Sequence, residues 1–327
     1  MTTLSAILSK RTLDTRSNFK TSLILFGLVI AASLLSKGVF LQPANLLNLI
    51  FQNAVLIIIA LGQLLVIATG GIDLSVGAVM AVSSVTVVLF QDYSLPGSFA
   101  IAILIAAVFG LLSGALVTYI RLPAFVVTLA TMQIGYSVSK LLSDWGGSRG
   151  GTVYASMGGV EIPSSFVDFY KSSWNGIPYP LFICLAFLIL IGLYFRTSPG
   201  HFIHPVGGNE RAAFLSGIPT RLVKMAVYVI SAVLASIGGI LFVARVGLGD
   251  PQAGTWLALD SIAAVSIGGA SLSGGVGTVT GTFIGVVILS VLNNLMNLLG
   301  VPPTLQPAVK GLVILLAVYL NSAKKQA

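Results

Sequence analysis

Charged side chains are scarce in this sequence: Asp, Glu, Lys and Arg together make up only 8% of its 327 residues. A soluble domain carries about 25% charged residues, because it needs a surface that water can wet. Hydrophobic residues make up 56% of the chain, and its mean hydropathy is +1.01. This composition excludes a soluble protein and indicates a chain whose solvent is largely lipid.

Cysteine and histidine are nearly absent as well. Cys184 is the only cysteine, so no disulfide can form within the chain, and the two histidines are His201 and His204. An intramembrane enzyme would need a nucleophile with a base, or a set of metal ligands, and the sequence offers neither. The chain also lacks a phosphate-loop motif ending in Lys-Ser/Thr. We therefore expect no enzymatic activity, no metal site and no ATP binding on this chain.

Ten apolar runs predict the fold. A helix needs about 20 residues to cross the hydrocarbon of a bilayer. Eight strong runs lie near residues 21–36, 46–69, 74–90, 98–120, 123–142, 178–195, 222–244 and 277–299, and two weaker ones lie near 259–270 and 303–320. We therefore predict an all-α, polytopic membrane protein with about ten transmembrane helices.

The distribution of basic residues predicts the orientation. The chain has 17 Lys and Arg against 9 Asp and Glu, a net charge of +8. With ten spans and both termini in the cytoplasm, eleven of the basic residues fall on the cytoplasmic side, as the positive-inside rule requires. No clustered stripe of Lys and Arg predicts a nucleic-acid partner. The expected organisation is a cytoplasmic segment 1–20, a membrane domain 21–322 with a cytoplasmic loop 196–224 and a periplasmic loop 143–177, and a cytoplasmic tail 323–327.

Two glycine-rich segments interrupt apolar runs at matching places in the two halves. Residues 70–77 (GGIDLSVG) recur loosely as residues 268–275 (GGASLSGG). Paired interruptions of this kind are the best sequence indication of a transport path. The alternative is that Asp73 and Ser271 cap helices while the glycines allow tight turns. For Asp73 we expect a cap, because an uncapped carboxylate within the membrane costs about 2.5–3.5 kcal/mol.

The polar loop between the sixth and seventh strong runs predicts a short, capped helix. Asn209 can serve as its N-cap, Glu210 places negative charge in its first turn, and Gly217 ends it. Phe214 and Leu215 would then be exposed to water, which favours a protein partner. An amphipathic helix lying on lipid is the alternative.

Neutral polar side chains lie on otherwise apolar helices. On the second run they share one face, since a helix turns by about 100° per residue, and on the run 277–299 they cluster: Asn45, Asn48, Gln52, Gln63, Asn293, Asn294 and Asn297. Amides offer donors and acceptors to a hydroxylated solute without the cost of a charge. They can equally bond helices to one another, and both interpretations stay open for Gln52, Gln63 and Asn294. Asn45 and Asn48 are expected near the surface. The candidates for lining a pathway are Gln52, Gln63, Phe125, Asn293 and Asn294, with Gly70, Gly71, Gly268 and Gly269 letting the wall bend.

Four motifs in order resemble the monosaccharide permeases of bacterial ATP-binding-cassette importers. They are residues 70–77, residues 207–218 (GGNERAAFLSGI), residues 259–265 (LDSIAAV) and residues 268–277 (GGASLSGGVG). The resemblance covers nearly the whole chain, and residues 292–301 and 309–318 are most similar to the ribose-type members. It implies a subunit of the cell inner membrane that carries a monosaccharide, ribose first and another pentose or hexose as the alternative, from periplasm to cytoplasm.

The resemblance also implies partners. It implies a complex of two permeases, either two copies of this chain or this chain with a paralogue, and two cytoplasmic ATPase subunits that bind ATP and Mg, fed by a periplasmic sugar-binding protein. No cofactor is implied on this subunit. The short helix would be the coupling helix inserted into the ATPase, and the matching residues are Gly207, Gly208, Asn209, Glu210, Arg211, Ala212, Ala213, Ser216 and Gly217.

Cations on the outer loops are candidates for docking the sugar-binding protein. The outer loop 143–177 is too long for a simple turn and holds Arg149 and Lys171, and Arg245 lies in another outer loop. We expect these three side chains to meet carboxylates on the partner's rim and to steer its association.

An ion-coupled secondary transporter is the rival from another class. It would need intramembrane carboxylates for ion coupling. Only Asp73 and Asp260 lie near apolar runs, and both are expected at helix ends. A channel is also less favoured, because no ring of charge or carbonyl filter is evident.

Overall fold

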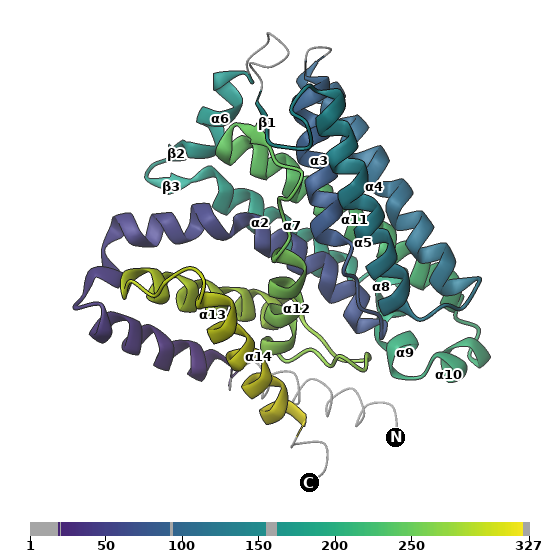
Figure 1. Ribbon diagram of the computed structural model, residues 1–327. Coiled ribbons are helices and arrows are strands. Elements are labelled where there is room, and N and C mark those ends of the chain that lie inside the picture. Colours follow the sequence, from purple (N-terminus) through teal and green to yellow (C-terminus); the bar gives the residue numbers. More distant parts are fainter. Residues whose placement is uncertain (1–18, 20, 92–93, 155–161, 323–327) are drawn as a thin grey trace.

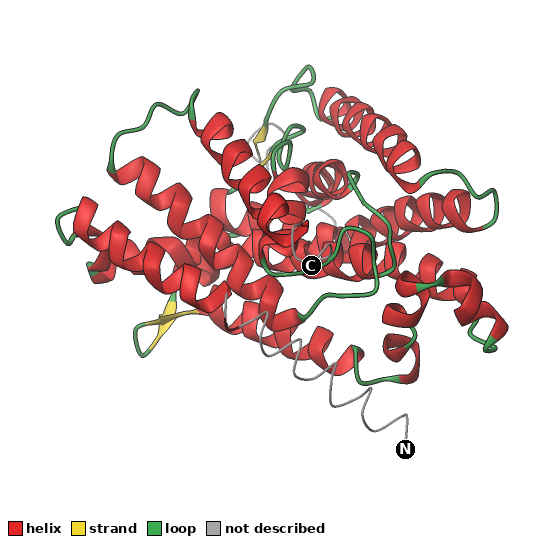
Figure 2. Ribbon diagram, turned by 90° about the horizontal axis from the view of Figure 1, so that it is seen from below, coloured by secondary structure: helices red, strands yellow, loops and turns green. Residues whose placement is uncertain are grey.

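Helices form almost the whole structure. The computed structural model describes residues 19, 21–91, 94–154 and 162–322, and Figure 2 shows helices through nearly all of it. Every one of the ten predicted apolar runs is a helix: Thr21–Leu35, α2 (Pro43–Ala68), α3 (Val76–Phe90), α4 (Leu95–Thr118), α5 (Ala124–Trp145), α7 (Tyr179–Tyr194), α11 (Thr220–Val246), α12 (Leu257–Ile267), α13 (Val279–Leu298) and α14 (Gln306–Ser322).

Short elements connect these helices. They are the 3₁₀ helix η1 (Val39–Leu41), the helices α6 (Ser164–Lys171), α8 (Ser198–His201), α9 (Ile203–Gly208) and α10 (Glu210–Leu215), and the two-residue strands β1 (Val153–Tyr154), β2 (Ser173–Trp174), β3 (Ile177–Pro178) and β4 (Leu248–Gly249). Strand β1 pairs antiparallel with β4, and β2 pairs antiparallel with β3. The all-α class is confirmed, with strands confined to the loops.

The apolar helices differ in whether they are long enough to cross a membrane by themselves. Among the described residues, five helices are long and apolar enough to span a membrane alone, namely α2, α4, α5, α11 and α13. Helix α7 and the α8–α9 segment form a sixth candidate, bent by 76° between its two parts. The helix Thr21–Leu35, α3 and α12 are apolar but shorter. A polytopic membrane protein is therefore confirmed, whereas the number of ten crossings stays a prediction.

Helix α3 lies at the centre of one half of the structure. It packs against α4, α5 and α11, and these three helices lie around it in Figure 1. Every residue from Val76 to Val88 is buried. A helix that is apolar all round is the form expected for such a position, because no face of it meets a polar solvent.

The packing of α4 shows how the bundle is held. Its buried face carries small residues, among them Ala102, Ala106 and Gly110, while large residues such as Leu104 and Val108 are exposed. Lipid tails are as apolar as leucine, so helices in a bilayer associate through close contact of small residues. The arrangement of small residues inside and large residues outside is the one expected for a helix facing lipid.

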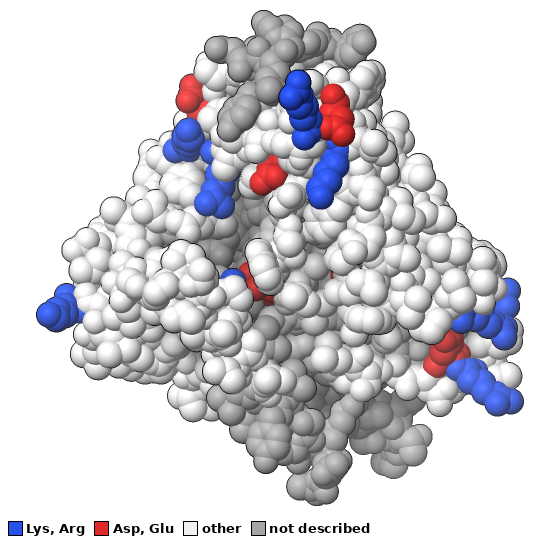
Figure 3. All heavy atoms as spheres, viewed as in Figure 1, with Lys and Arg blue, Asp and Glu red and all other residues white. Residues whose placement is uncertain are grey.

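Charged side chains gather at two ends of the molecule. Figure 3 shows one group over α6 and β1 at the top and another over α10 at the lower right, while the surface between them is mostly uncharged apart from a cation at the left edge and a few charged atoms in a central hollow. We call these the α6 end and the α10 end. The separation fits two membrane faces with hydrocarbon between them.

Candidate functional site

Three glycine segments that are far apart in the sequence meet at the α10 end. The Gly275 N–H donates to the Ala68 carbonyl at the end of α2 at 3.0 Å. A Cβ on Gly207 would lie 1.9 Å from that same carbonyl oxygen, and a Cβ on Gly274 would lie 2.6 Å from the Gly207 oxygen and 2.8 Å from the Gly70 nitrogen. We call Gly70, Gly207, Gly274 and Gly275 the glycine junction. It joins both interrupted motifs to the segment that leads into α10, backbone against backbone.

The glycine pair Gly268-Gly269 lies elsewhere. A Cβ on Gly268 would meet the Gly281 carbonyl oxygen at 2.3 Å, so this glycine lets α12 approach α13. Gly71 lies against the Tyr228 hydroxyl, 2.5 Å from a built Cβ. The motif 268–275 therefore reaches the glycine junction through Gly274 and Gly275. The comparison of the two sequence halves emphasised Gly268 and Gly269 instead.

Asp73 holds the break between α2 and α3. Its side chain is fully buried, and Oδ1 accepts hydrogen bonds from the Ser75 N–H at 2.9 Å and the Ser75 hydroxyl at 2.6 Å. Oδ2 accepts from the Ser231 hydroxyl of α11 at 3.1 Å. The carboxylate thus organises the turn before α3 and ties this turn to α11, but it is not the expected cap, because the N-cap residue of α3 is Ser75 and no side chain caps this helix.

The Gln63 amide completes the same network. In the orientation that satisfies both of its groups, Nε2 donates to the Asp73 carbonyl at 3.0 Å and Oε1 accepts from the Asp73 N–H at 3.2 Å. Gln63 is fully buried in α2. In this conformation the Gln63 side chain therefore bonds α2 to the backbone of Asp73, in the segment that separates α2 from α3.

The other candidate lining residues are spread over the molecule. Asn294 and Asn45 exchange two amide hydrogen bonds, of 2.8 and 3.0 Å, which tie α13 to the start of α2. The Asn293 side-chain oxygen is buried without a hydrogen-bond partner among the described residues. Gln52 is exposed near the α6 end, and Phe125 is 53% exposed on α5. Their role in a pathway stays a prediction.

Sequence reasoning missed a polar stripe on α5. Gln133, Ser137 and Lys140 are all exposed, and spacings of four and three residues place them on one face of the helix. Polar side chains on a membrane-spanning helix seldom face lipid. The periodicity that grouped the amides of α2 would have found this stripe in the run 123–142.

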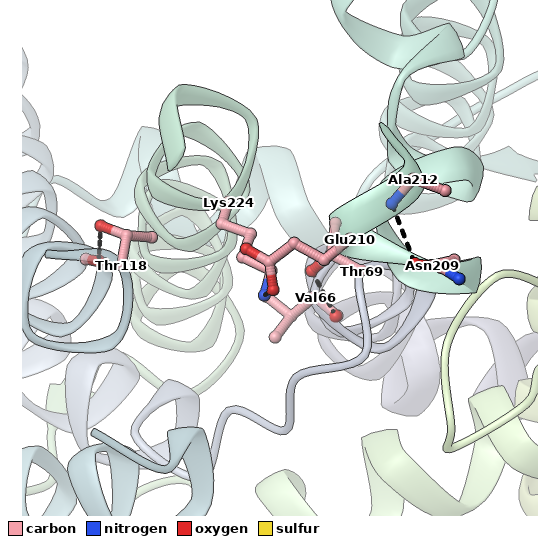
Figure 4. Close-up of polar contacts among 8 residues, drawn as sticks. Val66, Thr69, Thr118, Asn209, Glu210, Ala212 and Lys224 are labelled. Carbon is pink, nitrogen blue, oxygen red and sulfur yellow. Dashed lines mark hydrogen bonds and ion pairs between the residues drawn. The ribbon is translucent and has the colours of Figure 1, made fainter. Parts of the chain in front are cut away.

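The short helix α10 has the predicted cap. The Asn209 Oδ1 accepts a hydrogen bond from the Ala212 N–H at 3.0 Å, as Figure 4 shows. Glu210 in the first turn forms an ion pair with Lys224 of α11, 2.5 Å between the charged atoms. Phe214 and Leu215 are 66% and 77% exposed, so the helix presents an apolar tip to its surroundings.

A cavity of about 720 Å³ lies beside α10. Its wall is formed by the α2–α3 break, the turn between α4 and α5, α10 and the first turns of α11. The glycine pair Gly70-Gly71 lines it together with Glu210, Arg211 and Lys224. The cavity therefore connects the break to the predicted coupling helix.

A second ion pair occupies the two-helix contact between α12 and α14. The Lys310 Nζ lies 3.0 Å from the Asp260 Oδ2, and both side chains are largely buried. Asp260 lies in the first turn of α12, where negative charge is favourable. Together with the bonds to Asp73, this pairing leaves neither candidate intramembrane carboxylate free.

The three predicted docking cations lie at the α6 end. Arg149 and Lys171 are exposed, and pairing of β1 with β4 brings the loop of Arg149 beside the one that follows Arg245. Arg245 lies in the last turn of α11 rather than in the expected outer loop, is half-buried, and donates to the Gln52 carbonyl at 3.3 Å. Two of the three cations are thus fully available at the surface, and the third also supports α2.

Comparison with known proteins gives a consistent family. A model described as branched-chain amino acid transport system / permease component matches residues 45–318. The ribose import permease protein RbsC of Bacillus subtilis (strain 168) is 41% identical over 92% of this chain and 91% of its own length, and that of Escherichia coli (strain K12) is 38% identical over 94% of each. The xylose transport system permease protein XylH of Haemophilus influenzae is 32% identical over 90% of this chain and 93% of its own length. No solved structure matches the chain. The chain therefore belongs to this family of membrane-spanning permease components, together with the ribose import permeases.

Proposed function

We propose that this chain is the membrane-spanning subunit of an ATP-binding-cassette importer that carries ribose from the periplasm to the cytoplasm. The observation that carries the proposal is the 41% identity to a ribose import permease along 92% of the chain. In this proposal the protein lies in the bacterial inner membrane with about ten crossings and both termini in the cytoplasm. The α10 end is then the cytoplasmic face and the α6 end the periplasmic face.

The partners follow from the same proposal. A cytoplasmic ATPase binds ATP and Mg and receives α10, and a periplasmic sugar-binding protein docks on the surface of Arg149 and Lys171. A second permease, most simply another copy of this chain, completes the membrane part. We place this second permease opposite the α5 stripe of Gln133, Ser137 and Lys140. A water-filled path between the two permeases would then hydrate these polar side chains.

Two alternatives are weaker. Xylose or another pentose is the runner-up substrate, supported by the 32% identity to a xylose permease. An ion-coupled transporter needs a carboxylate that can exchange its ion, whereas Asp260 is paired with Lys310 and Asp73 accepts three hydrogen bonds.

Uptake measured in proteoliposomes tests the function directly. The chain is reconstituted with its ATPase inside and its sugar-binding protein outside, and radiolabelled ribose is added. We expect uptake only with ATP, and competition by unlabelled ribose at lower concentration than by xylose. Uptake driven by an ion gradient without ATP would exclude the importer, and stronger competition by xylose would replace ribose as the substrate.

The same assay examines docking. Arg149→Glu with Lys171→Glu should slow uptake at limiting binding protein and low ionic strength, because rim charges act mainly on association rate. Saturating binding protein should restore the rate. A variant that binds and transports like the unmodified chain at low salt would contradict this docking surface.

Leu215→Asp tests the coupling helix. The side chain is 77% exposed, so the change should leave the fold intact while placing a charge in the ATPase contact. Burial of a leucine contributes about 1.5–3 kcal/mol, so we expect co-purification of the ATPase to fall at least tenfold. Leu215→Met, which keeps an apolar side chain of similar size, is the matched control. Equal ATPase recovery from both variants would mean that α10 is not the contact.

The proposed pathway residues are Gln52, Gln63, Phe125, Asn293 and Asn294, and Gly70, Gly71, Gly268 and Gly269 are its proposed flexible points. Cysteine accessibility at Gln52 and Gln63, and at Gln133 of the α5 stripe, tests this pathway. Cys184 is first replaced by Ser to remove the background; it is buried in α7. In the complex, a cysteine at Gln52 or Gln133 should react with a small water-soluble thiol reagent, and one at Gln63 only while ATP is hydrolysed. Protection of all three positions in every nucleotide state would mean that these side chains serve helix packing alone.

A further inference from the structure

The cavity beside α10 carries an excess of positive charge. Four of its lining residues are cations, Arg121, Arg211, Arg221 and Lys224, against the single carboxylate of Glu210. Glu210 pairs with Lys224, and no described carboxylate lies in ion-pair range of the three arginines. Three arginines from three different elements therefore line one concave space without a counter-charge among the described residues, and the Arg221 guanidinium also lies over the Tyr119 ring, 5.8 Å from its centroid.

Arg121 stands at a backbone position that favours glycine. Its φ is +63°, in the left-handed region, within the turn from α4 to α5 that the Leu122 N–H closes on the Leu116 carbonyl at 3.2 Å. A residue with a side chain costs about 1–2 kcal/mol in this conformation, and glycine would remove that cost. The backbone of the turn therefore does not itself favour an arginine here.

Tyr228 supplies a donor at the buried wall of the same cavity. The side chain is 1% exposed and lines the space next to Gly71. Its hydroxyl has no hydrogen-bond partner among the described residues. A buried unpaired O–H is unfavourable by about 1–3 kcal/mol, so an acceptor placed in the cavity would be stabilised by it.

We propose that this cavity binds a phosphate-bearing anion. Arg121, Arg211 and Arg221 pair with the phosphate oxygens, for which the planar guanidinium is suited, and the Tyr228 hydroxyl donates to one oxygen at the wall. A volume of about 720 Å³ holds a phosphate group with a body the size of a sugar or glycerol. The anion is either a soluble phosphate ester or the headgroup of an anionic lipid. This site does not depend on which sugar is transported.

Two arms distinguish these sources, both on the full chain assembled with its ATPase in nanodiscs. In the first, discs of phosphatidylcholine are titrated with inorganic phosphate and with ribose 5-phosphate at constant ionic strength, and binding is measured by calorimetry. In the second, discs contain phosphatidylglycerol, and native mass spectrometry counts the lipids that remain on the released complex. We expect saturable binding in at least one arm. Binding in the calorimetry arm would identify the anion as a soluble phosphate ester, and binding in the phosphatidylglycerol arm would identify it as a lipid headgroup.

Three variants locate the site. Arg121→Gly relaxes the backbone while removing a charge, and Arg221→Gln removes another; each should weaken binding at least tenfold. Tyr228→Phe removes only the unpaired hydroxyl, so it should weaken binding about threefold or more without lowering the thermal midpoint. Arg196→Gln, an exposed cation outside the cavity wall, should bind as the unmodified chain does. Absence of binding in both arms, equal binding by all variants, or binding that disappears whenever the ATPase is present would overturn the proposal.

Discussion

Gly207→Ala is expected to lower ribose uptake more than tenfold and to lower the thermal midpoint of the chain, whereas Gly208→Ala should leave the thermal midpoint unchanged. The added Cβ at Gly207 would lie 1.9 Å from the Ala68 oxygen and 2.7 Å from the Gly275 nitrogen. Both atoms belong to the backbone, so no side-chain rotation can relieve the clash and the glycine junction must open. Overpacking of this kind costs about 1–3 kcal/mol, and here it falls on the contact between the coupling segment and both interrupted motifs.

Gly208 is the matched control because a Cβ there meets nothing within 4 Å. The thermal midpoint of the purified chain and the uptake rate are measured for both variants. Gly207→Ala should reduce both quantities, and Gly208→Ala should leave the thermal midpoint as it is in the unmodified chain. A Gly207→Ala protein with the midpoint and uptake of the unmodified chain would show that the junction is looser than its backbone contacts indicate.

Asp73→Ala is expected to destabilise the chain by about 3 kcal/mol or more and to abolish uptake. The carboxylate accepts from the Ser75 N–H, the Ser75 hydroxyl and the Ser231 hydroxyl, and all these groups are buried. Without an acceptor each donor keeps its desolvation penalty, since no water reaches it. The start of α3 should then detach from α11.

Two further variants distinguish the contribution of side-chain volume at Asp73 from the contribution of its hydrogen bonds. Asp73→Asn keeps the side-chain volume and one oxygen, so its thermal midpoint should lie between those of Asp73→Ala and the unmodified chain. Ser231→Ala removes a single partner and should cost about 1 kcal/mol. If Asp73→Ala unfolds at the same temperature as Ser231→Ala, the bonds to Ser75 contribute little and the network is not what fixes the break.

The sequence predicts the helices well because their signal is local. Apolar runs are read directly from the residues, and each of the ten proved to be a helix. Their function as crossings is harder to predict, since α3 and α12 are shorter than a bilayer requires by themselves. The cap of α10 was also predictable, because Asn209 and Ala212 lie within one turn.

Contacts between distant segments were not predictable in this way. The local sequence pattern does not predict that Gly207 lies against Ala68, or that Asn294 of α13 forms hydrogen bonds with Asn45 of α2. An amide that lines a path and an amide that bonds two helices occupy the same periodic positions, and only the neighbouring helix decides between them. The α5 stripe differs, because its spacing was visible and its meaning follows from exposure on a helix of spanning length.

The short length of α3 has a consequence for the surrounding bilayer. Its 15 residues rise about 22 Å, less than the hydrocarbon thickness of about 30 Å, yet the helix is enclosed by protein and touches little lipid. Helices α4 and α5, of 24 and 22 residues, are about 36 and 33 Å long and expose most of their surface. A thicker or thinner membrane therefore acts on the tilt of α4 and α5, and the polar break at the start of α3 is insulated from it.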